Sequence, residues 1–288
     1  MLLAVAATAF TFTACNDDDN DGPKPFESEL IGSYKSAPVT MTIPGVIKEP
    51  ADFNFILLPT WSDPENIPGI DLPASMELSA GTFVMPMNTI CGLLQVMVSN
   101  IVKGGLVQID LKNDGSFGAQ YYDLIIKTDG ETGEPDIISS LMGPTFGTVV
   151  KTFPNADTAE LLPEGALGYY TKDSRFYFTL SKDFLKGVGT SAGLDVLSVI
   201  DEMIKTYKLD IVSTDAYYGV PLKYSVKDGV TKLYVDRGMI LSFRGVLEMV
   251  FSLLGDDAAF KGIKLEDIVN KVLDNTTELE IALPLKRI

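Results

Sequence analysis

The chain has 288 residues, of which 46% are hydrophobic, so it can build a substantial core and is not a disordered chain. Its formal net charge of −16 argues against nucleic acid and against an anionic membrane surface as main partners, because both attract Lys and Arg. Histidine is absent and there are only two cysteines, Cys15 and Cys91, so we expect no metal and no cofactor.

The first fourteen residues, MLLAVAATAFTFTA, are apolar and end in small residues directly before Cys15. A segment this short cannot cross a hydrocarbon core, which needs about 20 residues, so 1–14 is expected to be a signal peptide. The ending FTAC resembles a bacterial lipobox, and this resemblance implies that Cys15 is acylated and anchors the mature chain. No Lys or Arg precedes the apolar run, so we expect the true start to lie upstream, or the chain to have been trimmed.

The acidic run after Cys15 has two interpretations, of which the first is a calcium loop. Asp17, Asp19, Asp21 and Gly22 match the opening of an EF-hand loop. The twelfth position of such a loop needs a bidentate glutamate, and here it is Ser28. Calcium binding is therefore not favoured.

The second interpretation is an address. The sequence CNDDDN places Asp17, Asp18 and Asp19 close behind Cys15, which resembles the surface-export signal of Bacteroidetes lipoproteins. This resemblance implies a protein on the outward face of the outer membrane, attached through its lipid alone, with 15–29 as an acidic tether. As a whole, the chain is similar to Bacteroidetes surface lipoproteins of unknown function, and that similarity implies no activity.

Patterns typical of a folded domain begin at residue 30. Residues that are β-branched or aromatic, lying between turn signals, predict strands at 33–43, 51–58, 76–85, 106–126, 175–180 and 277–285. Within KNDGSF, Asp114-Gly115 is expected to form a tight hairpin turn.

Three strongly apolar helices are predicted by stripes of residues at helical spacing. They occupy 90–101, 196–207 and the region 246–273. The stripes consist of Ile90, Leu93, Leu94, Met97, Val98 and Ile101; Val196, Val199, Ile200, Met203, Ile204 and Tyr207; and Val246, Met249, Val250, Leu253, Leu265, Ile268, Val269 and Val272.

Together these elements predict an α+β fold with a largely antiparallel, curved sheet and apolar helices packed against it. The segment 31–43 is similar to 167–180, which favours a diverged duplication joined near 150–163. Chance similarity between apolar segments is the alternative. We therefore expect a β-rich half at 30–155 and an α+β half at 156–288.

One motif, GVGTSAG at 187–193, looks catalytic. Its last five residues spell G-x-S-x-G, but no histidine exists to take the proton of Ser191. Asp210 follows G-x-G at about the distance of a dinucleotide site, but the third glycine is misplaced by one residue. We interpret the glycines as supplying positive φ in a connection between a strand and a helix.

Few other residues qualify as candidates for a site. Trp61, the only tryptophan, lies in the Pro-rich LPTWSDPENIPG and is a candidate ligand contact, although a lone Trp more often anchors a loop. Cys91 lies beside the first helical stripe and is expected to be a small buried residue. None of the 39 Asp and Glu residues can be paired from sequence as the carboxylates of a glycosidase.

The function expected from these features is a non-catalytic binding module of the cell surface, for a glycan, a peptide or a partner in an uptake complex. The alternative is a lipid carrier, with apolar helices and ten methionines around a cavity. The two halves are similar to tubular lipid-binding proteins, and LIGSYKS resembles the entrance strand of lipocalin-like domains, with Tyr34 in place of their Trp. A carboxylate-dependent glycan hydrolase is the third hypothesis.

Overall fold

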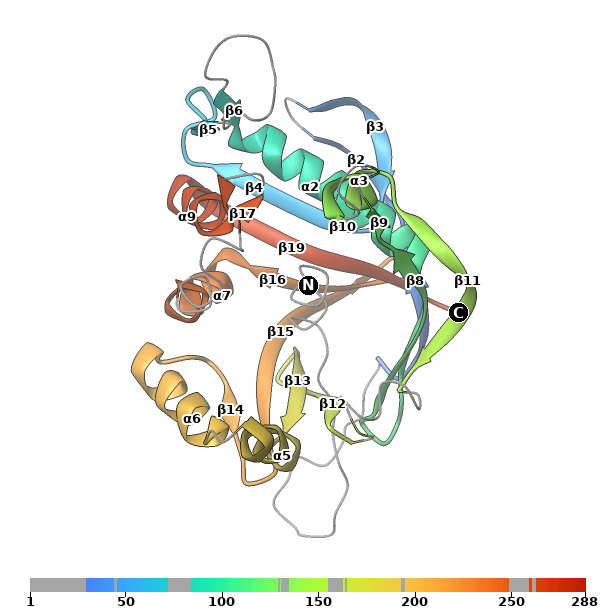
Figure 1. The fold of residues 1–288 in the computed structure, drawn as a ribbon, viewed down its shortest axis with the longest axis vertical. Coiled ribbons are helices and arrows are strands. Elements are labelled where there is room, and N and C mark those ends of the chain that lie inside the picture. The colour runs from blue at the N-terminus through green and yellow to red at the C-terminus, as the bar shows by residue number, and fades with distance from the viewer. Residues whose placement is uncertain are drawn as a thin grey trace. The chain divides into compact units, whose positions relative to one another are not determined.

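The computed structural model describes residues 30–43, 46–71, 84–128, 130, 135–154, 163, 165–192, 195–248, 259–260 and 263–288. The chain folds into two compact units, each built from separate segments (Figure 1). Unit 1 consists of residues up to Ala37, Ile101–Leu233 and Pro284–Ile288; unit 2 consists of Pro38–Asn100 and Tyr234–Leu283. Each unit therefore takes residues from both of the halves expected from the sequence, 30–155 and 156–288.

Unit 1 contains a first run of antiparallel strands. Their order is β11 (Thr145–Phe153), β8 (Phe117–Ile125), β7 (Leu106–Leu111), β1 (Gly32–Ser36) and the end of β19 (Thr276–Arg287). Between β7 and β8, Lys112 N donates to Ser116 O at 3.0 Å and Gly115 has φ +83°. The predicted turn at Asp114-Gly115 is confirmed.

Unit 1 contains a second run of antiparallel strands. It consists of β12 (Leu167–Lys172), β13 (Arg175–Ser181) and β15 (Tyr217–Lys227), all antiparallel, with short β14 (Val212–Ser213) beside β15. Asp173 and Ser174 both have positive φ, as a tight two-residue hairpin requires. An isolated bridge between Ser116 and Gly168 links this run to the first, and both runs belong to one sheet. Figure 1 shows β15 strongly bent.

Two helices cover one face of the second run. Helix α5 (Lys182–Ala192) and helix α6 (Val196–Tyr207) pack on buried residues of the strands, among them Leu167, Leu180 and Tyr218. The hydroxyl of Tyr218 donates to Asp201 at 2.8 Å, which fixes α6 to β15. The bounds of α6 are those predicted from its apolar stripe. Unit 1 also contains β9 (Lys127–Thr128), β10 (Pro135–Asp136) and α3 (Ile137–Met142).

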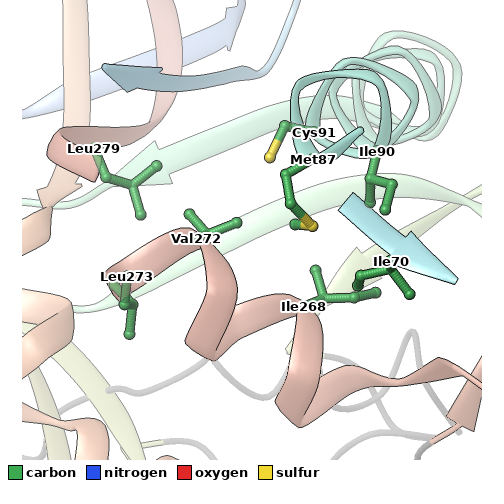
Figure 2. Close-up of a cluster of buried hydrophobic side chains, with 8 residues drawn as sticks. All are labelled: Ile70, Met87, Ile90, Cys91, Ile268, Val272, Leu273 and Leu279. Carbon is green, nitrogen blue, oxygen red and sulfur yellow. The ribbon is translucent and has the colours of Figure 1, made fainter. Parts of the chain in front are cut away.

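Unit 2 is built around one apolar cluster, in which α2 (Met87–Gly105, its last turn in unit 1) faces α9 (Leu265–Asn275) (Figure 2). The buried members are Ile70, Met87, Ile90, Cys91, Ile268, Val272, Leu273 and Leu279. The strands of this unit are paired as β2 (Val39–Ile43) with β3 (Ile47–Phe53), β4 (Ile56–Trp61) with β19, β5 (Gly69–Asp71) with β6 (Val84–Pro86), and β17 (Ala259–Phe260) with β18 (Ile263–Lys264). Helix α7 (Arg237–Ser242) follows β16 (Val230–Asp236).

The predicted class, α+β with a large antiparallel sheet, is confirmed, but the expectation of three helices is too small. Seven helical segments occur among the described residues. The region 246–273 overlaps a helical segment at 244–248 and the separate helix α9, so one predicted apolar stripe covered two helices. Of the predicted strand 76–85, only its last two residues are described, and Met249, Val250 and Leu253 also lie outside the described residues.

Candidate functional site

The structural feature that best fits a binding site is the face of β12, β13 and β15 opposite α5 and α6, which we call the tyrosine face. Side chains alternate between the two faces of a strand, and directly paired residues share a face. Three cross-strand rows define the tyrosine face: Gly168, Thr179 and Gly219; Tyr170, Tyr177 and Pro221; and Lys172, Arg175 and Lys223. Tyr217 lies on this face too, two residues before Gly219. All of these residues belong to unit 1 and stand on strands, so their backbone positions are rigidly set.

Stacked aromatic rings form the base of the tyrosine face. Tyr170 and Tyr177 lie parallel, with ring centroids 4.6 Å apart, and Tyr217 is tilted against Tyr170 at 6.0 Å. The ring of Tyr170 covers Gly219, because a Cβ at that position would meet the tyrosine hydroxyl at 3.2 Å. Tyr170 and Tyr177 are only 4% and 8% exposed. These two rings therefore form the packed base of the face.

Two hydroxyl groups on this face have no hydrogen-bond partner among the described residues. They are Thr179 Oγ1, on a residue that is 2% exposed, and the buried hydroxyl of Tyr217. Ser116 Oγ is a third, and its residue forms a bridge with Gly168, the cross-strand neighbour of Thr179. Leaving a buried polar group unpaired costs about 1–3 kcal/mol, so these groups need partners from outside the described chain, such as water or a ligand.

The tyrosine hydroxyls are donors over the whole physiological range. Burial raises the pKa of Tyr217 to about 12, and burial likewise raises the pKa of Tyr170. Because a neutral phenol both donates and accepts a hydrogen bond, Tyr217 suits a ligand that carries hydroxyl groups.

The outer row of the tyrosine face carries positive charge. Arg175 lies directly between Lys172 and Lys223 on neighbouring strands. Asp210, which precedes β14, forms an ion pair with Arg175 at 2.6 Å, and both side chains are substantially exposed. Like charges placed directly opposite one another on neighbouring strands destabilise a sheet. Three cations in register are therefore unexpected, above all in a chain with a net charge of −16.

The residues singled out by sequence lie elsewhere. Cys15, Asp17, Asp18 and Asp19 are outside the described residues, so lipidation and the export signal stay predictions. None of the helices in the described ranges combines the length and the hydropathy that a membrane span needs.

Trp61 is the last residue of β4, where it pairs with Thr276 and packs against the apolar cluster of unit 2. The next residue, Ser62, donates its hydroxyl to Asn275 O at 3.0 Å. This packing matches the alternative stated above for Trp61, in which a lone Trp anchors a loop. Its contact with a ligand stays a prediction.

The two catalytic-looking motifs have structural explanations. Residues 187–192 are the second half of helix α5, and the residues with positive φ do not include Gly187 or Gly189. The expectation of a glycine connection between strand and helix is therefore wrong, because β13 passes directly into α5 at Lys182. Ser191 is inside the helix rather than on a strand-to-helix elbow, and Asp210 is occupied by Arg175.

Two further sequence expectations concern reactive groups. Cys91 is 3% exposed within the apolar cluster, and burial raises the pKa of its thiol to about 12, which confirms a buried, unreactive residue. Among the described residues, no group of three His, Cys, Asp or Glu side chains is placed to hold a metal ion.

Sequence reasoning did not find the tyrosine face. Its first two strands lie within LGYYTKDSRFYFTL, where the cluster of aromatic residues was a visible signal. Lys223 and Tyr217, however, join the face only through the pairing of β13 with β15. Comparisons with protein families, with curated proteins and with solved structures found no match for this chain. What the face can bind follows from its own residues and geometry.

Proposed function

We propose that this chain is a lipid-anchored protein of the outer-membrane surface whose folded part binds a glycan without catalysing its hydrolysis. The observation that carries the proposal is the pair of unpartnered hydroxyls, Thr179 Oγ1 and Tyr217 Oη, on a tyrosine-lined face of the sheet. The lipobox at Cys15 and the acidic cluster behind it support the location.

A glycan suits this face because its hydroxyl groups donate and accept hydrogen bonds, as do those of Thr179 and Tyr217. A ligand that forms a hydrogen bond with each of these two hydroxyls removes the free-energy cost of leaving them buried and unpaired in the free protein. Tyr217 adds apolar ring surface beside its hydroxyl, and a tyrosine combines these two properties at low cost in side-chain entropy.

The packing of the opposite face favours this proposal over a lipid carrier. Phe176 stacks with Tyr169 at 5.3 Å and meets Phe178 edge-on at 5.1 Å. Phe178 in turn contacts Phe117 from β8 at 6.0 Å. Side chains of the protein thus fill this interior, as is usual for a close-packed core.

The test is a printed array of neutral, uronate-bearing and sulfated oligosaccharides, probed with the wild type and with Thr179→Val and Tyr217→Phe. Each substitution removes one hydroxyl and almost no volume, so we expect about tenfold weaker binding of the best ligand. Tyr207→Phe is the matched control, because Tyr207 lies on α6 and is 39% exposed.

An array without any bound oligosaccharide would refute glycan binding. Binding that survives both substitutions unchanged would show that the glycan occupies another surface. Native mass spectrometry of the Cys15→Ser protein supplies an independent check, since a lipid that co-purifies and is lost on denaturation would favour the carrier instead.

A further inference from the structure

We propose that the tyrosine face selects acidic glycans, and that the row Lys172, Arg175 and Lys223 binds their carboxylate or sulfate groups. This inference rests on the proposed function and names the class of glycan. Its first support is the register itself, which places three cations directly opposite one another on β12, β13 and β15. Such an arrangement opposes folding, and bound anions would relieve the repulsion.

Two of these cations, Lys172 and Arg175, have reserve capacity for an anion. Lys172 is exposed, and no carboxylate of the described chain is paired with it. Arg175 has one carboxylate partner among the described residues, Asp210, and the two side chains are 44% and 65% exposed. Exposed ion pairs are worth little, so an incoming carboxylate can replace Asp210 at small cost, and a guanidinium can hold it by two hydrogen bonds.

The cation row and the unpartnered hydroxyl of Thr179 are close enough for one ligand. Lys172 follows Tyr170 by two residues on β12, and Arg175 precedes Tyr177 by two on β13. Thr179 is two residues further along the same face. Two residues of a strand span about 7 Å, so the charged row and Thr179 are about 13 Å apart along the sheet. An oligosaccharide covers this distance, whereas a single inorganic anion reaches the cations alone.

Asp210 and an acidic ligand would compete for the same cation, Arg175. It is the carboxylate of the chain itself that occupies Arg175, so it competes with the acidic group of a ligand. Asp210→Asn keeps the shape of the side chain and removes its charge. We therefore expect this variant to bind an acidic glycan about threefold to tenfold more tightly than the wild type does.

The experiment measures binding by calorimetry to a uronate oligosaccharide and to the same oligosaccharide with its carboxylates reduced to alcohols. For the acidic form we expect Arg175→Gln and Lys172→Gln each to weaken binding about tenfold, and the affinity to fall as salt is added. For the reduced form we expect no change on either substitution. Lys48→Gln is the matched control, because Lys48 is an exposed cation on β3 of unit 2.

The outcomes separate this inference from the proposed function. If the two forms bind equally and Arg175→Gln affects neither, while Thr179→Val weakens both, glycan binding stands and selection by charge is overturned. If neither form binds, both are overturned. Tighter binding by Asp210→Asn supports the inference, because a purely structural role of the ion pair predicts no gain. Competition by sodium sulfate alone at equal concentration would show a general anion site and overturn selection of a glycan.

Discussion

On helix α2, two polar side chains are as deeply buried as the apolar ones around them. Gln95 is 0% and Ser99 4% exposed, and both lie on the face of the helix turned toward the link between β3 and β4. Ser99 Oγ accepts from Asn54 N at 2.6 Å, and Gln95 Oε1 accepts from Leu57 N at 3.2 Å. The helix thus supplies acceptors for backbone donors where one strand ends and the next begins.

The first prediction follows from the shorter of these two bonds. Ser99→Ala leaves the buried N–H of Asn54 without its acceptor, so we expect the free energy of unfolding to fall by about 1–3 kcal/mol. Urea denaturation followed by circular dichroism measures it. Asn100→Ala, one residue further along the helix and exposed, should change it by less than about 0.5 kcal/mol. Equal effects of the two variants would contradict the assigned role of the hydroxyl.

A second prediction at this scale concerns Cys91. Burial raises the pKa of its thiol from 9.0 to about 12, so thiolate is scarce at neutral pH and the sulfur is also shielded. In a Cys15→Ser chain, a thiol reagent at pH 8 should label Cys91 only after denaturation. The neutral thiol contributes stability below pH 9, and this contribution declines as the pH rises toward 12. Rapid labelling of the folded protein would contradict the burial.

Helix α6 shows how an amphipathic element divides its apolar stripe. Val196, Leu197, Ile200 and Ile204 pack on the strands of unit 1, whereas Val199 is 52% exposed. The helix begins at Asp195, whose carboxylate accepts from Ser198 N at 3.2 Å. Capping accounts for the start of the helix, and periodicity accounts for the face that packs on the strands.

From this division comes the third prediction. Ile204→Ala removes a side chain that packs against the strands, and we expect it to lower the free energy of unfolding by about 1–2 kcal/mol. Val199→Ala, the matched control on the same helix, should cost less than about 0.5 kcal/mol. Thermal and urea unfolding compare the two variants. A greater loss at Val199 would mean that an unseen partner covers the outer side of α6.

Element type was readable from sequence because it depends on local patterns. The stripe at 196–207 predicts α6, and the one at 90–101 predicts the centre of α2. Which members of a stripe face the core depends on the surface that receives them. Gln95 and Ser99 lie off the predicted apolar stripe, yet they are buried because the backbone of β3 and β4 needs acceptors there.

The candidate site could not be predicted from the sequence, because it depends on the pairing of distant strands. Tyr170 and Tyr177 are close in sequence, and a hairpin brings them together. Arg175 meets Lys223 only because β13 pairs with β15 across 48 residues of chain, and no local pattern encodes that register. The glycine motif in α5 led to a wrong prediction because it is a conspicuous local pattern, yet in the fold its residues are part of a helix.

At the scale of the whole molecule, the first and last strands tie distant parts of the chain into each unit. In unit 1, Ser36 of β1 pairs with Leu285, and in unit 2 Trp61 of β4 pairs with Thr276. The C-terminal strand β19 therefore contributes to both units, and neither unit is a continuous stretch of sequence. Removing β19 should disrupt both, because each loses a partner strand in its interior.

The last prediction concerns where the protein resides. If Cys15 is acylated and Asp17, Asp18 and Asp19 act as the export signal, alanine at these three aspartates should leave the protein membrane-bound but facing inward. Antibody labelling and protease digestion of intact cells would then lose most of their signal, while the total amount in membranes stays constant. Asp21→Ala is the matched control, since it removes an acidic residue outside the cluster, and it should remain fully accessible. Cys15→Ser should instead release the protein from membranes, because the lipid is its proposed attachment. Unchanged accessibility of the triple variant would refute the address while leaving the lipid anchor in place.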